Sequence, residues 1–131
     1  MIGLDTNVVV RYIMQDDVKQ SKLATALMER LTDVQPGFLS LVCITELVWV
    51  LESAYGLVRQ QVVDVLSNLI SIDVLKIERV SVVAAAIRNF REGSADFADC
   101  LIERSAANAG CERTMTFDRS AARTANMVLM Q

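Results

Sequence analysis

The sequence predicts an α/β protein, a three-layer α/β/α sandwich built on a mostly parallel sheet. Short apolar segments that suit strands alternate with longer segments of helical periodicity, which favours parallel strands covered by helices on both faces. No stretch rich in Pro, Ser or Gly is long enough to be a linker, so we expect residues 1–131 to form a single domain. With 53% hydrophobic residues, the chain can fill a buried core.

The first segments combine a strand with two helices. Residues 1–4 are a short apolar start, and the apolar residues within 7–14 suit a strand or a helix equally. We interpret this region as a strand followed by a short helix. Residues 17–32 are predicted to form an amphipathic helix because leucines recur at every fourth position, with charged residues on the other side. These leucines are Leu23, Leu27 and Leu31.

The next segments are separated by clear stop signals. Pro36 and Gly37 interrupt the chain before a brief predicted strand at residues 38–39. A helix is predicted over about residues 43–55, and Gly56 is placed to end it. Because this helix is apolar on most sides, we expect it to be buried or to face a partner.

A helix, a strand and another helix follow. The apolar stripe in residues 60–70 predicts a helix, and residues 74–77 are a candidate strand. Ser81 is predicted to be the N-cap of a helix that runs to Phe90.

The last segments repeat the alternation of helix and strand. After Gly93, Ser94 is predicted to cap a helix that runs to about residue 109. Residues 113–117 are a strand candidate, residues 120–126 a helical turn and residues 127–130 a last strand.

The composition excludes several kinds of chemistry. The chain has no histidine, which removes Ser-His-Asp and Cys-His nucleophiles and the usual catalytic zinc sites. A formal charge of −3 argues against a broadly basic surface that adheres to nucleic acid. The cysteines are odd in number and widely spaced, so we interpret them as small buried hydrophobes in a reducing cytoplasm. They are Cys43, Cys100 and Cys111.

No feature of the sequence points to a membrane or to export. Charged residues interrupt every apolar run well before the roughly 18–20 residues that span a bilayer. The start MIGLDTNVVV lacks the basic region of a signal peptide. We therefore expect a cytoplasmic protein with no membrane partner.

Five acidic residues are the candidates for chemistry. Asp5 and Asp118 directly follow short apolar segments, and the ligand crevice of a parallel sheet lies at the carboxyl ends of its strands. Asp96 and Asp99 are three residues apart, so both can lie on one face of a helix. Glu46 is the only charge within LVCITELVWVL, where a carboxylate normally faces a cation, a donor or water.

A cluster of such carboxylates needs a cation or protons. Two carboxylates about 5 Å apart repel by roughly 3 kcal/mol at an effective dielectric constant of about 20. Oxygen ligands without His or Cys suit hard ions, and Mg²⁺ is commonly held by a few carboxylates together with substrate phosphate. Such an ion activates water and stabilises charge on a phosphodiester during hydrolysis. The expected chemistry is therefore metal-dependent phosphodiester hydrolysis.

Each acid also has a structural interpretation. Asp5 and Asp118 could simply be N-caps of the helices that follow, and Asp96 could be a first-turn residue favoured by the helix dipole. Glu46 could face solvent on a helix whose other sides are buried.

Two further acids lie on the helix of Asp96. Asp99 could pair with Arg104 or another base. Glu103 lies four residues after Asp99, but because it is next to Arg104 we interpret it as half of a solvated ion pair.

Four segments that carry these acids resemble the PIN-domain ribonucleases, above all the toxin subunits of bacterial VapC-type toxin-antitoxin pairs. The segments are MIGLDTNVVVRY, LSLVCITELVWVL, SADFADCLIERSAANAG and TMTFDRSA. They are distributed over nearly the whole chain and follow the family's order. The resemblance implies an α/β/α metal-dependent endoribonuclease, usually a homodimer, that a small cognate antitoxin blocks.

The resemblance also implies roles for individual residues. The acidic metal-site residues would be Asp5, Glu46, Asp96 and Asp118, and Asp99 would be the auxiliary acid of the DxxD pair. Mg²⁺ or Mn²⁺ would bind directly to Asp5, Asp96 and Asp118, and directly or through water to Glu46 and Asp99. The polar residues that match the motifs are Thr6 and Asn7 beside the first Asp, and Thr116 two before the last. Asn126 and Met127 stand where the family would have a small, Gly-containing turn.

RNA recognition would depend on splayed single-stranded or loop nucleotides. Three arginines near the acidic segments are candidate phosphate contacts, although exposed arginines usually serve solubility. They are Arg11, Arg119 and Arg123.

Other functions fit less well. A haloacid-dehalogenase-type phosphatase would have a second Asp two residues after the first, where this chain has Asn7. A non-catalytic PIN-like interaction module with its partner surface around Trp49 would tolerate loss of the acids, and this chain retains them all. A nuclease of RNA maturation stays open, and a short open reading frame directly upstream would favour a toxin instead.

Overall fold

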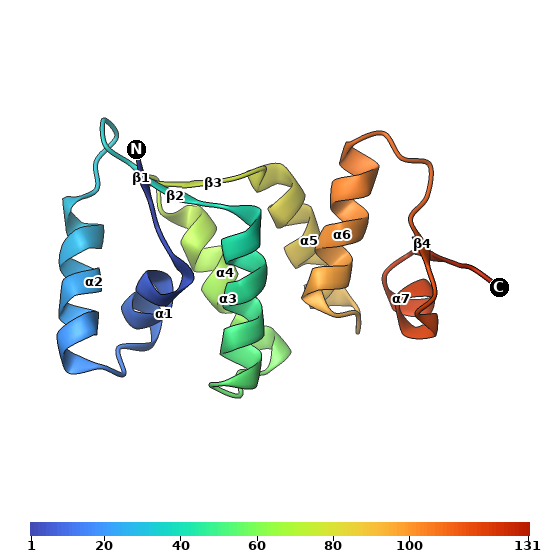
Figure 1. Cartoon of the computed structure of the whole chain (residues 1–131), viewed down its shortest axis with the longest axis horizontal. Coiled ribbons are helices and arrows are strands. Elements are labelled where there is room, and N and C mark those ends of the chain that lie inside the picture. The colour runs from blue at the N-terminus through green and yellow to red at the C-terminus, as the bar shows by residue number, and fades with distance from the viewer. The chain divides into compact units, whose positions relative to one another are not determined.

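A computed structural model describes residues 1–131 and shows two compact units, Met1–Glu78 and Arg79–Gln131 (Figure 1). The predicted α/β class is confirmed, because parallel strands are flanked by helices. The prediction of a single domain stays a prediction.

The first unit contains three strands and four helices. Its strands β1, β2 and β3 form one parallel sheet in that order, and they lie side by side in Figure 1. In chain order the elements are β1 (Ile2–Gly3), α1 (Thr6–Met14), α2 (Val18–Arg30), β2 (Gly37–Leu39), α3 (Leu41–Ser53), α4 (Arg59–Ser71) and β3 (Leu75–Ile77). The ambiguous segment after the first strand is therefore a helix, α1, as we interpreted it.

Gly37 leaves room for three leucine side chains that lie against β2. A Cβ atom at this position would lie 2.9 Å from Leu75 Cδ2, 3.0 Å from Leu31 Cδ1 and 3.2 Å from Leu4 Cδ1. These approaches are shorter than ordinary side-chain contacts, so a larger residue here would force the leucine side chains to shift.

The buried face of α2 differs from the predicted one. Leu23 is 63% exposed, whereas Ser21, Ala24 and Met28 are buried. The leucine repeat was therefore wrong as a guide to the core, because the neighbouring helical stripe of α2 is the one that is buried in the packing with α1. Only Leu31, which follows the helix, is buried as expected.

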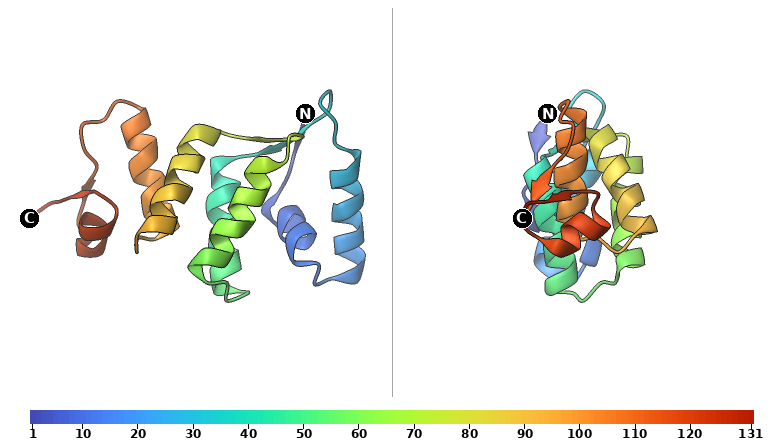
Figure 2. Two further views of the ribbon diagram at one scale, coloured as in Figure 1. Left: turned by 180° about the vertical axis from the view of Figure 1, so that it is seen from behind. Right: turned by 90° about the vertical axis from the view of Figure 1, so that its right-hand side faces the viewer.

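The second unit contains three helices and a two-stranded parallel sheet. Helices α5 and α6 run side by side, as both views in Figure 2 show. In chain order the elements are α5 (Val80–Glu92), α6 (Phe97–Asn108), β4 (Met115–Thr116), α7 (Arg119–Thr124) and β5 (Val128–Leu129).

The predicted serine caps of α5 and α6 were wrong. Arg79, in a left-handed conformation at φ 49°, occupies the N-cap position of α5, and Ser81 lies inside that helix. Asp96 occupies the N-cap position of α6, two residues after Ser94. Helix starts are hard to place from sequence when the N-cap makes no side-chain hydrogen bond, as is true of both residues.

The last strand forms despite the unusual turn before it. Asn126 adopts φ 58°, a left-handed conformation that asparagine tolerates better than most residues. Asn126 thus adopts the backbone conformation for which a glycine would be expected. Strand β5 pairs with β4 through Val128 and Leu129.

Each unit has its own buried apolar residues. In the first unit Leu39, Leu47 and Leu51 are fully buried. In the second, Phe90 and Phe97 meet edge to face, with ring centroids 5.6 Å apart. No helix is both long and apolar enough to cross a lipid bilayer.

Candidate functional site

The first unit brings Asp5 and Glu46 together through one residue, Thr6. Asp5 follows β1 and is the N-cap of α1, where its Oδ1 accepts a hydrogen bond of 2.8 Å from the backbone N–H of Thr6. The hydroxyl of Thr6 hydrogen bonds to Oε1 of Glu46 on α3. We call Asp5 and Glu46 the first acidic pair; both residues are exposed.

The start of α3 is held firmly at the carboxyl end of β2. Ser40, the N-cap, accepts a hydrogen bond of 3.0 Å from the N–H of Cys43. Glu78, which follows β3, accepts one of 2.8 Å from the N–H of Leu41. Because two of the N–H groups that a helix start leaves without partners are satisfied, the turn that precedes Glu46 is well defined.

A buried thiol lies behind the first acidic pair. The sulfur of Cys43 is 3.6 Å from the Thr6 hydroxyl oxygen, one helical turn before Glu46. Burial raises the pKa of Cys43, the hydrogen bond with Thr6 lowers it, and the charges of Asp5 and Glu46 raise it again. The net upward direction keeps this thiol protonated at neutral pH.

The second unit carries the other three acids, Asp96, Asp99 and Asp118, which we call the second acidic cluster. Asp96 is exposed at the N-cap position of α6, but its side chain makes no capping hydrogen bond. Asp99 lies in the first turn of the same helix and is half-buried. Neither Asp96 nor Asp99 has a side-chain partner in the protein, so no ion pair joins Asp99 to Arg104.

Asp118 follows β4 and caps α7. Its Oδ1 accepts hydrogen bonds of 2.8 Å from the N–H of Ser120 and 3.2 Å from the N–H of Ala121. The hydroxyl of Thr116 accepts a bond of 3.0 Å from the N–H of Asp118, which fixes the backbone rather than the carboxylate. Both capping bonds end on Oδ1, so Oδ2 remains available to a ligand.

The second acidic cluster is electrostatically unfavourable without a cation. The pKa of Asp99 is raised first by burial and then by the charges of Asp96 and Asp118. A bound cation would oppose all three effects by favouring the ionised carboxylate.

Glu103 belongs to a different arrangement. It is 5% exposed and accepts two hydrogen bonds through Oε2, at 2.9 Å from Nε and 2.7 Å from Nη2 of Arg104. The ion pair was predicted, but its solvated character was wrong, because Glu103 is buried. A charged group at this depth needs such a bidentate partner.

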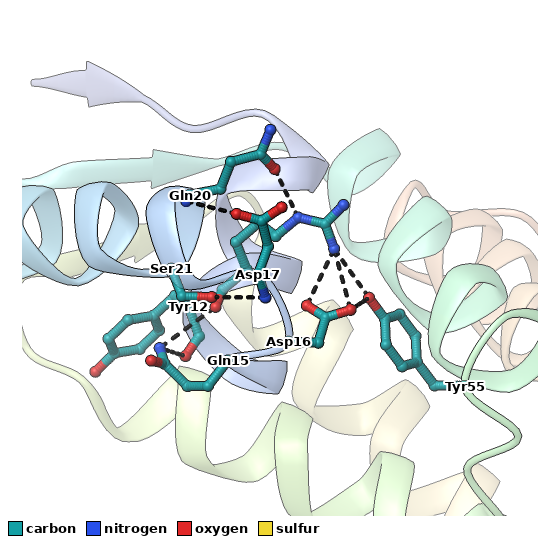
Figure 3. A network of polar contacts seen from close by, with 8 residues as sticks. Tyr12, Gln15, Asp16, Asp17, Gln20, Ser21 and Tyr55 are labelled. Atoms are coloured by element: carbon teal, nitrogen blue, oxygen red, sulfur yellow. Dashed lines mark hydrogen bonds and ion pairs between the residues drawn. The ribbon is translucent and has the colours of Figure 1, made fainter.

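The arginines near the acids differ in their availability. Arg11 donates to Gln20, to Asp16 and to the hydroxyl of Tyr55, a network shown in Figure 3. It also lies in the last turn of α1, about 9 Å along the helix axis from the Asp5 cap. Arg11 is therefore the weakest of the three candidate phosphate contacts.

The other two arginines remain accessible. Arg119 and Arg123 are exposed on α7, directly after Asp118. Asn7, the other polar residue of the first motif, is exposed on α1.

The carboxylates offer the oxygen donors that hard cations prefer. No three His, Cys, Asp or Glu side chains form a group that holds a metal ion by itself. A complete protein cage is not required for Mg²⁺, which keeps several waters and takes one or two carboxylates plus substrate phosphate. The first acidic pair and the second acidic cluster both fit that kind of ligation.

The sequence pattern missed two features of the site. The pattern predicts a buried hydrophobe at Cys43 but not its proximity to the acids, although its spacing of three from Glu46 places both on one face of α3. The Thr6–Glu46 bond joins residues 40 positions apart, which no local pattern reveals. Cys43 and Cys100 are buried as predicted, but Cys111 is exposed, so that part of the prediction was wrong.

The fold and the acids together define an α/β protein with oxygen-donor sites after its parallel strands. The chain belongs to the PIN domain family, whose pattern matches residues 2–127 and so includes every candidate acid. PIN domains are a family of nucleases and are typically metal-dependent. No curated protein matches the chain.

Proposed function

We propose that this PIN domain is a metal-dependent endoribonuclease that hydrolyses RNA phosphodiester bonds. The observation that carries the proposal is the match over residues 2–127, which covers Asp5, Glu46, Asp96 and Asp118. The two groups of acids add support, because neither is neutralised by a basic side chain: their hydrogen-bond partners are backbone N–H groups and the Thr6 hydroxyl.

The side chains have distinct roles in this proposal. When bound, Mg²⁺ or Mn²⁺ would supply Lewis acidity toward the phosphate and activation of water. In the first unit, Asp5 would hold such an ion directly and Glu46 directly or through water; in the second, Asp96 and Asp118 would hold one directly and Asp99 directly or through water. Arg119 and Arg123 contact backbone phosphates, and Thr116 keeps Asp118 in place through the backbone.

The test is cleavage of a mixed pool of structured RNA by purified protein with Mg²⁺, with Mn²⁺ and with EDTA. The variants Asp5→Asn and Asp118→Asn each remove one carboxylate charge, one from each unit. Asp17→Asn is a matched control, because Asp17 caps α2 as Asp5 caps α1 but lies outside the acidic groups. Asn is as good an N-cap as Asp, so all three variants should fold.

We expect metal-dependent cleavage by the wild-type protein and by Asp17→Asn. Both other variants should lose roughly 100-fold or more in rate, as is common when a group that stabilises transition-state charge is removed. Metal-dependent cleavage that survives in both Asp5→Asn and Asp118→Asn would refute the assignment of the acids. A wild-type protein that cuts no RNA with either metal would favour the non-catalytic interaction module.

We further propose that the nuclease is the cytoplasmic toxin of a toxin-antitoxin pair. The order and spacing of the four motif segments support this role. Expression of the wild-type chain should arrest growth of a bacterial host, Asp5→Asn should not, and co-expression of a short open reading frame next to the gene should restore growth. Normal growth with full RNA cleavage in vitro would favour RNA maturation.

The proposed partners are a second copy of the chain and the antitoxin. Trp49 and Val42 are 67% and 76% exposed on α3, which is unusual for large apolar side chains and supports a covered surface. Sedimentation equilibrium at micromolar concentration should give a dimer, and Trp49→Ser should weaken it. A wild-type monomer would contradict the homodimer.

A further inference from the structure

Thr6 contacts both members of the first acidic pair. It is the first residue of α1 and only 4% exposed. Its backbone N–H donates to Oδ1 of Asp5 at 2.8 Å, and its hydroxyl hydrogen bonds to Oε1 of Glu46. One buried residue therefore links a carboxylate after β1 to a carboxylate in the middle of α3.

The direction of the Thr6–Glu46 bond follows from counting protons. A hydroxyl has one proton to donate, and an ionised carboxylate has none. Thr6 therefore donates to Glu46, and a bond to a charged acceptor is the stronger use of that proton. The Cys43 sulfur, 3.6 Å from the Thr6 oxygen, is a weaker alternative acceptor for the same proton.

This arrangement restricts the orientation of Glu46. Glu46 is exposed, so water alone could satisfy its oxygens. Thr6 is buried among protein atoms, and its hydroxyl cannot rotate toward bulk water. The bond thus removes rotamer freedom from a long acidic side chain and leaves its other oxygen, Oε2, for a ligand.

We infer that Thr6 is a positioning residue that holds the Glu46 carboxylate in a metal-binding orientation beside Asp5. The inference rests on the proposed function, because it concerns the same acids. Groups that orient metal ligands through hydrogen bonds typically change metal affinity or activity by about 10–100-fold when they are removed. Thr6 would act through Glu46 and need not touch the ion or the RNA.

The test compares Thr6→Val, which has the same shape without the hydroxyl, with Thr6→Ser, which keeps it. Thr45→Val is the matched control, because Thr45 is a half-buried threonine of α3 whose hydroxyl donates to the backbone oxygen of Leu41 at 2.9 Å. The readouts are the Mn²⁺ dissociation constant from calorimetry without RNA, the free energy of unfolding in urea, and kcat and KM for RNA cleavage. Thr6→Ala replaces Thr6→Val if the latter does not fold.

We expect Thr6→Val to weaken Mn²⁺ binding by roughly 10-fold or more and to lower kcat more than it changes KM. Thr6→Ser and Thr45→Val should bind Mn²⁺ as the wild type does. In a Glu46→Gln background, Thr6→Val should cause no further loss of Mn²⁺ affinity, because Thr6 acts through Glu46.

Three results would overturn the inference. The first is a folded Thr6→Val protein that binds Mn²⁺ as tightly as the wild type while the wild type cuts RNA; the proposed function would then stand. The second is a loss of Mn²⁺ affinity from Thr6→Val that is equally large with Glu46 and with Gln at position 46. The third is a wild-type protein that neither binds Mn²⁺ nor cuts RNA, which would remove the proposed function as well.

Discussion

The acidic residues that follow β1 and β4 serve the fold and leave room for chemistry at the same time. Asp5 and Asp118 each use Oδ1 to cap a helix, so the structural interpretation of these residues is correct. A cap, however, needs only one oxygen acceptor, and the second oxygen of each carboxylate stays accessible. Capping and metal binding are therefore compatible at both residues. An Asp→Asn variant separates capping from metal binding, because asparagine still caps a helix but carries no negative charge.

Asp99 gives a pH-dependent prediction. Its pKa is raised by burial and by the charges of Asp96 and Asp118, so the folded state holds this proton more tightly than the unfolded chain. The contribution of Asp99 to stability is thus present below its ordinary pKa of 3.8 and is lost as the pH rises through the raised value. In metal-free buffer, Asp99→Asn should become progressively more stable than the wild type as the pH rises from 3.8 upward.

The size of this effect should stay under about 1 kcal/mol, because solvent screens a group that is only half-buried. Urea unfolding at a series of pH values measures it, with Asp33→Asn in an exposed turn as the control. Added Mg²⁺ should stabilise the wild type more than Asp99→Asn. An unchanged difference between the two proteins across the pH series would contradict the prediction.

At the scale of elements, most helices and strands could be predicted from the sequence. The face that each helix buries could not be predicted in every case. Gly56, at φ 66°, ends the helix that the apolar pattern of α3 predicted. In α2, by contrast, two stripes have helical spacing, one leucine-rich and one with Ser21, Ala24 and Met28. Hydrophobicity alone selects the leucines, whereas the packing of α2 against α1 buries the other stripe. Tertiary packing determines which stripe is buried, and the periodicity of the sequence carries no information about that packing.

The corrected stripe of α2 predicts unequal costs for two apolar truncations. Met28→Ala should lower the free energy of unfolding by about 2–4 kcal/mol, because it leaves a cavity beneath the helix. Leu23→Ala should change it by less than about 0.5 kcal/mol, since Leu23 is exposed. Urea denaturation of the two variants measures both values. A larger cost for Leu23→Ala would restore the leucine stripe as the buried face.

The turn between α1 and α2 is tied to the end of α3 by the network in Figure 3. Tyr55 donates to Oδ2 of Asp16 at 2.6 Å, and Arg11 donates to Oδ1 at 3.1 Å. The hydrogen bond from Tyr55 lowers the pKa of Asp16 most, burial opposes it, and the charge of Arg11 adds to the decrease. Asp16 therefore contributes stability above its ordinary pKa, and this contribution is lost as the pH falls through the lowered value.

Tyr55→Phe should move the pKa of Asp16 upward from its lowered value, because it removes the largest cause of the decrease. The ¹³Cγ resonance of Asp16, followed by NMR titration, reports this pKa directly. Tyr12→Phe is the control, because the hydroxyl of Tyr12 takes no part in the network. An Asp16 pKa that is equal in the wild type and in Tyr55→Phe would show that the hydrogen bond does not form in solution.

At the scale of the whole molecule, the sequence predicted the family of the chain better than the contacts among its polar side chains. The motif order pointed to the PIN domain family, which residues 2–127 match. It did not reveal that a threonine joins Asp5 to Glu46, because that contact depends on where α1 meets α3. Nor did it reveal the compact units Met1–Glu78 and Arg79–Gln131, since no linker composition separates them. Polar contacts between distant segments are set by tertiary geometry, and composition and spacing constrain them only weakly.

The prediction of a single domain can be tested by unfolding the chain with one probe in each unit. Trp49 is the only tryptophan and lies in Met1–Glu78. Cys111 is the only exposed cysteine and lies in Arg79–Gln131, so a thiol-reactive dye can be placed there selectively. We expect both probes to report one transition in urea with the same midpoint, because the second unit is shorter than the roughly 70–80 residues below which one core seldom supplies enough stability alone. Coincident transitions would be the behaviour of one cooperative domain. Separate midpoints would instead establish two domains that fold independently, with Asp5 and Glu46 on one and the remaining acids on the other.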